Sequence, residues 1–416
     1  MKKINVDLAI IGGAPSGLAA AVEASKQGID KILILERNIE LGGILQQCIH
    51  DGFGLQRFQK TLSGGQYAQN FIDELKNRSV DIKLNTMVLE ITKDKKIYAI
   101  NPQEGLLEIQ THTIILAMGC RERSASQALI FGSRPAGVLT AGTAQRYINL
   151  EGYLPGKNAV ILGSGDIGLI MARRMTLEGI KVKGVYEIMS SPGGLTRNIV
   201  QCLDDYDIPL HLSESVIAVH GKDKLTHITV AKVDENRLPI PGTEKDIACD
   251  LLVLAVGLIP ENELSKRLDL LMDQKTKGPV VDSHFMTSEP GFFAAGNVMA
   301  IFDLVDYVSL SGEIAARGAA QFLNGTLTGK EKSVFVEAGN NVNFVVPQKR
   351  TLEGKLKSET FFLRVKSPQK NVSLKCYQDH QSIYSKKHQV VTPPEMLSCV
   401  IRSGQPTPLK IQVEVQ

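Results

Sequence analysis

Two stretches of the chain share one pattern of apolar and polar positions. Each begins with an apolar run, passes through a glycine-rich turn, continues for about twelve residues with helical periodicity and ends in a second apolar run. The stretches are LAIIGGAPSGLAAAVEASKQGIDKILILE, residues 8–36, and AVILGSGDIGLIMARRMTLEGIKVKGVYE, residues 159–187. This order predicts strand, turn, helix and strand, and its repetition predicts an α/β fold with two copies of one unit.

The two copies lie in strict register, 151 residues apart. The matching positions are Gly12 and Gly163, Ala14 and Gly165, Gly17 and Gly168, Glu36 and Glu187, and Gly42-Gly43 and Gly193-Gly194. A glycine turn between a strand and a helix, with an acidic residue about 20 residues later, is typical of dinucleotide-binding folds. A single such motif is weak evidence for a dinucleotide-binding fold, whereas two motifs in register are strong evidence for one.

Each part of the motif has a physical task. The first glycine permits the tight turn, the third lets helix and strand approach, and the helix N-terminus attracts a pyrophosphate. Ala14 adds one methyl group where the chain passes the phosphates, which predicts a slightly shifted contact; a purely structural turn is the alternative. Glu36 and Glu187 can accept hydrogen bonds from ribose hydroxyls. Because a carboxylate repels a 2′-phosphate, Glu187 favours NAD over NADP, unless it is merely a surface residue.

The last part of the chain has a different pattern. After about residue 330 the helical periodicity stops, and short alternating segments separated by turns predict a β-sandwich of about 85 residues. Residues 330–416 carry 14 Lys and Arg against 7 Asp and Glu, a balance of +7. This excess indicates a solvated basic face or a docking surface for an acidic partner. A domain that only covers the core is the other interpretation.

Composition narrows the class of protein. Apolar residues make up 43% and charged residues 22%, as in soluble globular proteins, and the net charge of +3 argues against nucleic acid as the main partner. No apolar run approaches the roughly 18 residues of a membrane helix, and Met1-Lys2-Lys3 leads straight into a strand, without a signal peptide. Six scattered cysteines without C-x-x-C favour free thiols in the cytoplasm. The histidine spacing indicates no metal site.

Three further segments complete a family pattern. They are TIILAMGCRER (residues 113–123), DLLVLAVGLIPENEL (250–264) and PGFFAAGNVMAIFDLVDYV (290–308). Together with the two repeats they resemble the two-dinucleotide-binding-domain flavoproteins of the pyridine nucleotide–flavin oxidoreductase family, over about residues 4–325. The resemblance implies that the first Rossmann-like fold holds FAD and that the second, inserted within it, holds NAD(P)H.

The resemblance also implies roles for individual residues. Met118 replaces the threonine of the family's A-T-G, and Gly296-Asn297 replaces its Gly-Asp, in which an amide can still hydrogen-bond the flavin ribityl chain. The next helix aims its first amides at the flavin pyrimidine, and Asp303 is its expected cap. The predicted cofactor-binding residues are Gly12, Ala14, Pro15, Ser16, Gly17, Glu36, Arg37, Gly42, Gly43, Met118, Gly119, Gly163, Gly165, Asp166, Ile167, Gly168, Glu187, Gly257, Gly296, Asn297, Asp303 and Val305.

The predicted domain boundaries follow from these segments. Residues 1–125 and 270–328 form the FAD domain, residues 126–269 the inserted NAD domain, and residues 330–416 the β-rich domain.

Three functions agree with the pattern. The paired cysteines of the family's disulfide reductases are missing, and LGGILQQCIHDGFGL, GCRER and GYLPGKNAVILGSGDIGLIMARRM resemble flavoprotein subunits of opine oxidase, sarcosine oxidase and hydrogen cyanide synthase type. We therefore expect an NADH-linked electron-transfer subunit beside a second flavoprotein that oxidises an amine, opine or glycerol-3-phosphate type substrate. A stand-alone NADH oxidase or peroxidase would use Cys48, near His50, as its catalytic residue. A flavin-binding scaffold or redox sensor is the third interpretation.

Overall fold

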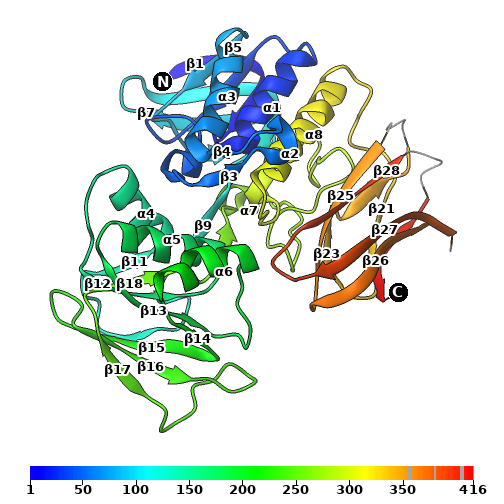
Figure 1. Cartoon of the computed structure of the whole chain (residues 1–416). Coiled ribbons are helices and arrows are strands. Elements are labelled where there is room, and N and C mark those ends of the chain that lie inside the picture. Colours follow the sequence, from blue (N-terminus) through cyan, green and yellow to red (C-terminus); the bar gives the residue numbers. More distant parts are fainter. Residues whose placement is uncertain (354–357, 379–380, 403–406, 416) are drawn as a thin grey trace. The chain divides into compact units, whose positions relative to one another are not determined.

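The computed structural model describes residues 1–353, 358–378, 381–402 and 407–415. The chain separates into two compact units. The first unit contains residues 1–120 and 260–416, and the second contains residues 121–259, as the colours of Figure 1 allow the reader to follow. The chain passes from one unit to the other in β9 (Cys120–Glu122) and returns in β19 (Leu258–Pro260).

The first unit is built on a seven-stranded sheet in the order β5-β2-β1-β8-β7-β6, with β20 beside β8. Five of its strands run parallel: β1 (Lys2–Ile11), β2 (Ile32–Leu35), β5 (Val80–Lys83), β8 (Gly105–Leu116) and β20 (Phe292–Ala294). The antiparallel strands are β6 (Met87–Ile91) and β7 (Lys96–Asn101). The apolar ends of β1 and β2 are buried throughout, as expected for parallel strands covered on both faces.

Three helices of the first unit pack together. Helix α1 (Pro15–Lys26) lies between α3 (Gly64–Lys76) and α8 (Val305–Leu323), as Figure 1 shows. Small residues allow the close approach of α1 and α8, because a Cβ on Gly312 would stand 2.1 Å from the Ser16 carbonyl oxygen. The shorter elements are η1 (Gly43–Gln47), β3 (Asp51–Phe53), α2 (Leu55–Phe58), β4 (Leu62–Ser63), α7 (Glu263–Arg267) and η3 (Gly296–Val298).

The second unit repeats the parallel arrangement. Its main sheet has the order β11-β18-β12-β13-β14. The strands are β11 (Val138–Thr140), β12 (Asn158–Leu162), β13 (Lys181–Glu187), β14 (Leu210–Leu212) and β18 (Leu251–Leu254). The helices are α4 (Ala141–Asn149), α5 (Asp166–Leu177), α6 (Thr196–Cys202) and the short η2 (Asp204–Tyr206). A second sheet contains β10 (Phe131–Gly132), β15 (Glu214–His220), β16 (His227–Lys232) and β17 (Lys245–Ala248).

The unit boundaries differ from the predicted ones at both crossings. Residues 121–125 belong to the second unit, where Ala125 packs against its core. Residues 260–269 belong to the first unit, because Leu264 and Leu268 pack into the core of the first sheet. Because of the side chains that each segment buries, both boundaries lie closer to the N-terminus than the predicted ones.

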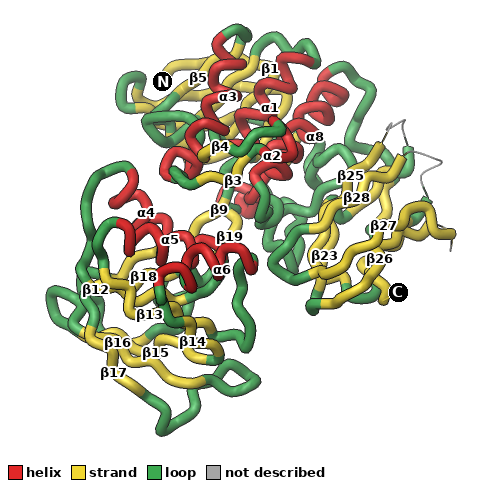
Figure 2. Tube along the Cα trace, in the orientation of Figure 1, coloured by secondary structure: helices red, strands yellow, loops and turns green. Residues whose placement is uncertain are grey.

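The C-terminal region is rich in strands, shown in yellow in Figure 2, as the alternating pattern predicts. One sheet contains β22 (Glu337–Ala338), β29 (Leu409–Val415), β26 (Gln369–Gln378) and β27 (Gln381–Val391). The other contains β23 (Val342–Val346), β25 (Ser358–Val365) and β28 (Leu397–Arg402), and β21 (Ser333–Phe335) pairs with β24 (Lys349–Thr351). Buried residues from both sheets share one apolar core, which makes the region a β-sandwich.

The sandwich packs against the segment that leads into α8. The ring of Phe362, from β25, lies 5.1 Å from the ring of Phe302 and 5.2 Å from that of Tyr307. Phe362 and Met396 belong to the same buried core as the first sheet. The sandwich is therefore joined to the first unit by shared core residues.

Within the described ranges, no helix has the length and apolarity needed to cross a membrane.

Candidate dinucleotide-binding sites

The outer glycines of the first turn are required by the protein's own packing. Gly12 has a φ of 108°, and a Cβ there would stand 2.4 Å from the Ala117 carbonyl oxygen. A Cβ on Gly17 would stand 1.9 Å from the Gly12 carbonyl oxygen. Both distances are far below van der Waals contact, so neither position accepts a larger residue without moving β1 or α1.

The second turn has the same construction. Gly163 has a φ of 104°, and a Cβ there would stand 2.2 Å from the Ala255 carbonyl oxygen. A Cβ on Gly168 would stand 2.2 Å from the Gly163 carbonyl oxygen. Residues that occupy equivalent positions in the two repeats of the sequence therefore also make equivalent packing contacts in the structure.

The middle position of the motif, unlike the outer two, does not require glycine for the protein's own packing. Gly165 caps α5 with φ −64°, and a Cβ there would have no protein atom within 4 Å. Ala14 caps α1 with φ −85°, a conformation that any residue adopts. Neither backbone requires glycine, and open space lies before the first amides of α5. These features fit an anionic group at the helix N-terminus.

Gly43 accommodates the extra methyl group of the first turn. A Cβ on Gly43, which has a φ of 55°, would stand 2.8 Å from the Cβ of Ala14. The preceding Gly42, with a φ of 100°, donates its N–H to the Gly13 carbonyl oxygen at 2.8 Å. Residues 42–43 therefore lie directly on the glycine turn, and the missing side chain of Gly43 leaves room for Ala14.

Both acidic residues are buried and hold their own turns. Glu36 accepts hydrogen bonds from the Gly13 N–H at 2.7 Å and the Asn38 N–H at 2.8 Å. Glu187 accepts bonds from the N–H and hydroxyl of Ser164, at 2.9 and 2.6 Å, and from the Met189 N–H at 3.0 Å. Glu187 is only 7% exposed, so it is not a surface residue that merely ends a strand. Each carboxylate still has acceptor capacity for a ribose hydroxyl.

The second turn has an additional anchor in Asp166, the first residue of α5. Its carboxylate accepts the Leu195 N–H at 2.9 Å and the Asn198 side-chain amide at 2.7 Å. Gly193 donates its N–H to the Ser164 hydroxyl at 2.9 Å. Asp166 thus ties the glycine turn to α6, while Ile167 lies half-buried beside it.

The fold brings the distant Gly296 to the start of α1. A Cβ on Gly296 would stand 2.7 Å from the hydroxyl oxygen of Ser16, a residue that follows the buried Pro15. The Gly296 N–H donates to the Ser311 hydroxyl at 2.7 Å, which ties the segment to α8. Residues from the two ends of the first unit therefore meet at one helix N-terminus.

Arg37 and Gly119 are linked through Glu261. The Arg37 guanidinium lies 3.7 Å from the Glu261 carboxylate, and the Glu261 N–H donates to the Gly119 carbonyl oxygen at 3.0 Å. Met118, just before Gly119, packs half-buried against the first core. In the second unit, Gly257 has a φ of 101° and accepts the Arg123 N–H at 3.0 Å.

Asn297 contacts both the turn that follows it and the end of β8. Its side-chain oxygen accepts the Phe302 N–H at 3.0 Å. Its amide donates to the Cys120 sulfur at 3.5 Å, a bond that an ionised aspartate could not donate. The amide thus has a structural role beside the expected flavin contact.

The expected cap of α8 by Asp303 is wrong. The helix begins at Val305, its N-cap is Leu304, and no side chain caps it. The Asp303 carboxylate instead accepts the Met396 N–H of the sandwich at 3.1 Å. Asp303 also interacts with Arg364. Burial lowers the pKa of the Arg364 guanidinium, and the negative charge of Asp303 partly opposes this shift. The packing of the sandwich against this segment takes Asp303 away from the helix terminus.

Cys48 is buried in the segment after the first repeat. It is 8% exposed, and its thiol donates to the Ile44 carbonyl oxygen at 3.3 Å. Burial raises the pKa of the Cys48 thiol to about 12. Burial also lowers the pKa of His50, against the opposing charge of Asp51. The thiol is therefore protonated at neutral pH, which disfavours a reactive thiolate.

Two structurally important residues were not among the predicted site residues. Ser164 holds Glu187 and Gly193 together, and Glu261 links Arg37 to Gly119. The register offers a signal for the first, because Ser164 places a hydroxyl where the first repeat has Gly13. No local pattern distinguishes Glu261, whose partners come from distant parts of the chain.

Comparisons with known proteins agree with this architecture. Residues 6–321 match the pyridine nucleotide-disulphide oxidoreductase family. The chain is similar to hydrogen cyanide synthase subunit HcnB of Pseudomonas protegens, with 26% identity over 334 residues, 74% of this chain and 68% of the relative. It is 25% identical to an opine oxidase subunit of Agrobacterium tumefaciens, over 75% of this chain and 65% of that protein.

Solved structures share the fold. T. acidophilum thioredoxin reductase aligns with a TM-score of 0.61 and 24% identity, covering 76% of this chain and 98% of that one. An NAD-dependent persulfide reductase from A. fulgidus aligns with a TM-score of 0.59 and 17% identity, covering 99% of this chain and 74% of that one. The chain belongs to the pyridine nucleotide-disulphide oxidoreductase family and is an FAD- and NAD(P)-dependent oxidoreductase.

Proposed function

We propose that this chain is an NADH-linked electron-transfer subunit that works beside a second, substrate-oxidising flavoprotein. The observation that carries the proposal is the pair of equivalent glycine turns, each leading into a helix N-terminus and each held by its own buried carboxylate. The first turn would hold FAD and the second NAD(H). When bound, these cofactors supply hydride exchange between the nicotinamide and the flavin, so the chain itself needs no acid or base for that step.

The roles of the chain's residues are binding and orientation. The first amides of α1 and α5 would face the two pyrophosphates, and Glu36 and Glu187 would accept ribose hydroxyls. Gly43, Gly119, Gly296 and Asn297 would line the flavin, and Gly193 would lie near the nicotinamide dinucleotide. Apart from Asp303, whose expected capping role is excluded, the other predicted cofactor-binding residues are proposed to support these contacts.

We propose that Glu187 makes the second site prefer NADH to NADPH. The carboxylate is held by three hydrogen bonds and cannot swing aside without breaking them. A 2′-phosphate would bring negative charge next to it at a partly dehydrated position. The expected cost is the repulsion between these charges, which is absent for NADH.

The substrate-oxidising partner is expected at the C-terminal sandwich. Strand β27 is the edge of its sheet and exposes Lys386 and Lys387. Its backbone edge and positive charge suit an acidic partner surface. HcnB and the opine oxidase relative are themselves subunits, which supports an assembled protein. The proposed substrate of that assembly is of the amine, opine or glycerol-3-phosphate type. The six cysteines, none of which forms a disulfide in the described residues, fit a proposed cytoplasmic location.

The oxidase or peroxidase alternative depends on Cys48. Its raised pKa and buried thiol argue against it, whereas nothing in the electron-transfer proposal needs this residue. A Cys48→Ser variant separates the two. Unchanged NADH oxidation with oxygen or peroxide supports the electron-transfer proposal, and loss of that turnover alone supports the alternative.

The first experiment is an anaerobic titration of the flavin-loaded protein with NADH and then NADPH, followed at the flavin absorption band. NADH should bleach the band, and NADPH should need a higher concentration. Glu187→Ala should narrow the difference, while Glu178→Ala, at the exposed end of α5, serves as its control. A flavin that neither nucleotide reduces would contradict the proposed hydride exchange and favour a scaffold or sensor.

The partner proposal has its own test. The chain is purified from its native cells at low salt, and the flavin content and mass of the assembly are measured. A second flavin-containing subunit, lost in the Lys386→Glu/Lys387→Glu variant but kept in a Lys2→Glu/Lys3→Glu control, is the expected result. A chain that purifies alone would contradict the proposal.

A further inference from the structure

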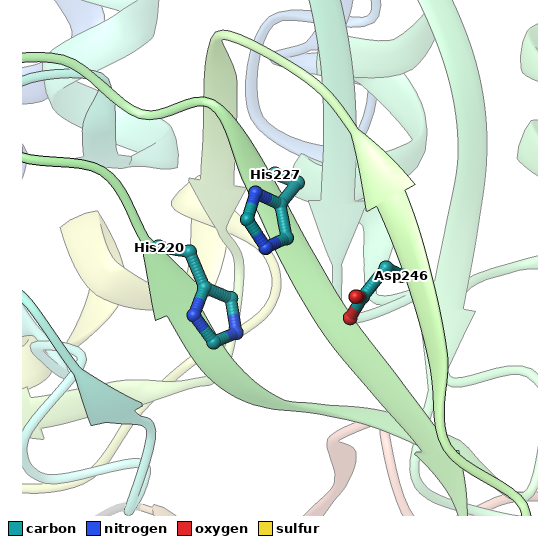
Figure 3. A group of neighbouring side chains, drawn as sticks. All are labelled: His220, His227 and Asp246. Atoms are coloured by element: carbon teal, nitrogen blue, oxygen red, sulfur yellow. The ribbon is translucent and has the colours of Figure 1, made fainter.

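Three side chains with metal-ligating atoms meet on one face of the β10-β15-β16-β17 sheet. His220 ends β15, His227 begins β16 and Asp246 lies in β17, as Figure 3 shows. One ligand atom from each lies within 4.8 Å of the others. Residues 1–353, 358–378, 381–402 and 407–415 contain no other such group of three.

Strand pairing explains the meeting. His220 is the antiparallel partner of His227, and Asp246 is the partner of Thr229. Because side chains alternate along a strand, His227 and Thr229 point to the same face of β16. Their partners on the flanking strands point to that face too. The two imidazole rings stack at 4.3 Å between centroids, with an angle of 6° between planes.

Two threonines orient the imidazoles. The Thr226 hydroxyl donates to the His220 carbonyl oxygen at 3.1 Å, so it accepts from Nδ1 of His227 at 3.0 Å. This bond places the His227 proton on Nδ1 and leaves the lone pair on Nε2. A hydrogen bond from the other ring nitrogen is the usual support of a metal-ligating histidine.

Thr229 connects the other two groups. Its hydroxyl donates to the Asp246 carboxylate at 2.7 Å and lies 2.8 Å from Nε2 of His220. The carboxylate and the second imidazole are thereby held on opposite sides of one small hydroxyl. Both histidines are half-buried and Asp246 is exposed, so an ion can enter from solvent and lose only part of its hydration.

We propose that His220, His227 and Asp246 bind a divalent transition-metal ion of the Zn²⁺ class, with water completing the coordination. Two imidazoles and one carboxylate suit Zn²⁺ and Cu²⁺, whereas Mg²⁺ and Ca²⁺ prefer oxygen ligands. The site belongs to the second sheet of the second unit and does not depend on the proposed electron transfer. Binding would join β15, β16 and β17 through one ion.

The test is calorimetric titration of Zn²⁺ into the full chain, without an affinity tag and after removal of metal by a chelator. The expected result is one site per chain that His227→Gln weakens at least about tenfold and Asp246→Asn weakens less. The control is His112→Gln, which removes an exposed histidine from β8 and should leave the affinity unchanged. Circular dichroism checks that each variant is folded.

A spectroscopic readout identifies the ligands. Bound Cu²⁺ should show hyperfine coupling to two imidazole nitrogens in the wild type and in His112→Gln, and to one in His227→Gln. Equal Zn²⁺ affinity in the wild type and His227→Gln would overturn the proposal. So would the absence of binding by the wild type, or a Cu²⁺ spectrum that His227→Gln leaves unchanged.

Discussion

The two glycine turns are alike where the protein contacts itself and differ where it faces open space. Gly12 and Gly163 have the same positive-φ conformation, and Gly17 and Gly168 approach equivalent carbonyl oxygens, those of Gly12 and Gly163. The middle position is Ala14 in one turn and Gly165 in the other, where an added Cβ would meet no protein atom within 4 Å. Packing thus explains the outer glycines, whereas the backbone at the middle position does not require glycine in either turn.

The segments behind the two turns differ more strongly. In the first repeat, residues 42–43 adopt left-handed conformations, and Cys48 directly follows the short helix η1. In the second, Ser164 and Asp166 of the glycine turn accept the N–H groups of Gly193 and Leu195, in the segment that leads into α6. In the first repeat, the following segment is joined to the glycine turn by a backbone hydrogen bond, from Gly42 to Gly13. In the second repeat, the side chains of Ser164 and Asp166 make the corresponding connection.

The largest expected effect concerns Cys48. Its folded-state pKa is about 12 against an ordinary 9.0, so at pH 8 the thiolate fraction should be about a thousandfold below that of an unfolded thiol. Alkylation by iodoacetamide, followed by peptide mass spectrometry, should be correspondingly slow at this residue.

The same shift gives a direction for stability. The folded state holds the Cys48 proton more tightly than the unfolded state does. The contribution of Cys48 to the free energy of unfolding is therefore complete below pH 9 and is lost as pH rises from about 9 toward 12. Cys48→Ser should reduce this alkaline loss. Fast alkylation of Cys48 at pH 8 would contradict the burial argument and revive the peroxidase alternative.

The next effect distinguishes the outer glycines. Gly17→Ala and Gly168→Ala each place a Cβ within about 2 Å of a carbonyl oxygen, so each should destabilise its own unit by about 1–3 kcal/mol. Urea unfolding measures the loss. Flavin retention should fall only in Gly17→Ala, and NADH binding chiefly in Gly168→Ala. Equal loss of both ligands in both variants would mean that the two turns do not serve separate sites.

A slightly smaller effect is expected at the acids. Glu36→Gln and Glu187→Gln exchange charge-assisted hydrogen bonds for neutral ones, with an expected loss of about 1–2 kcal/mol in the free energy of unfolding. Glu187→Gln should lose more, because its carboxylate accepts three bonds and Glu36 accepts two from the residues named above. If Glu36→Gln lost more unfolding free energy than Glu187→Gln, the number of hydrogen bonds to each carboxylate would not explain the relative stability of the two variants.

The smallest effect on folding belongs to the middle position. Gly165→Ala meets no protein atom, so the unfolding free energy without nucleotide should change by less than about 0.5 kcal/mol. Its affinity for NADH, measured by calorimetry, should nevertheless fall. Ala14→Gly is the matched change in the first turn. Unaltered NADH affinity in Gly165→Ala would place the pyrophosphate elsewhere.

Much of the fold was readable because its signals are local. The apolar strands, both glycine turns, their acids and the alternating tail each lie within one short segment, and the α/β class with a β-rich C-terminal domain is confirmed. The compact units change near residues 120 and 260 and not at the predicted boundaries, and the expected cap by Asp303 is wrong. They depend on which core a side chain joins, and no local pattern records that choice.

The sequence by itself determined the two repeats, because a tight turn beside a packed helix excludes every residue but glycine at the two outer positions of the motif. Only the tertiary structure decided that Gly296 meets Ser16, that Glu261 joins Arg37 to Gly119, and that His220, His227 and Asp246 share one face of a sheet. Such meetings arise from helix packing and strand register, which combine contributions from the whole chain.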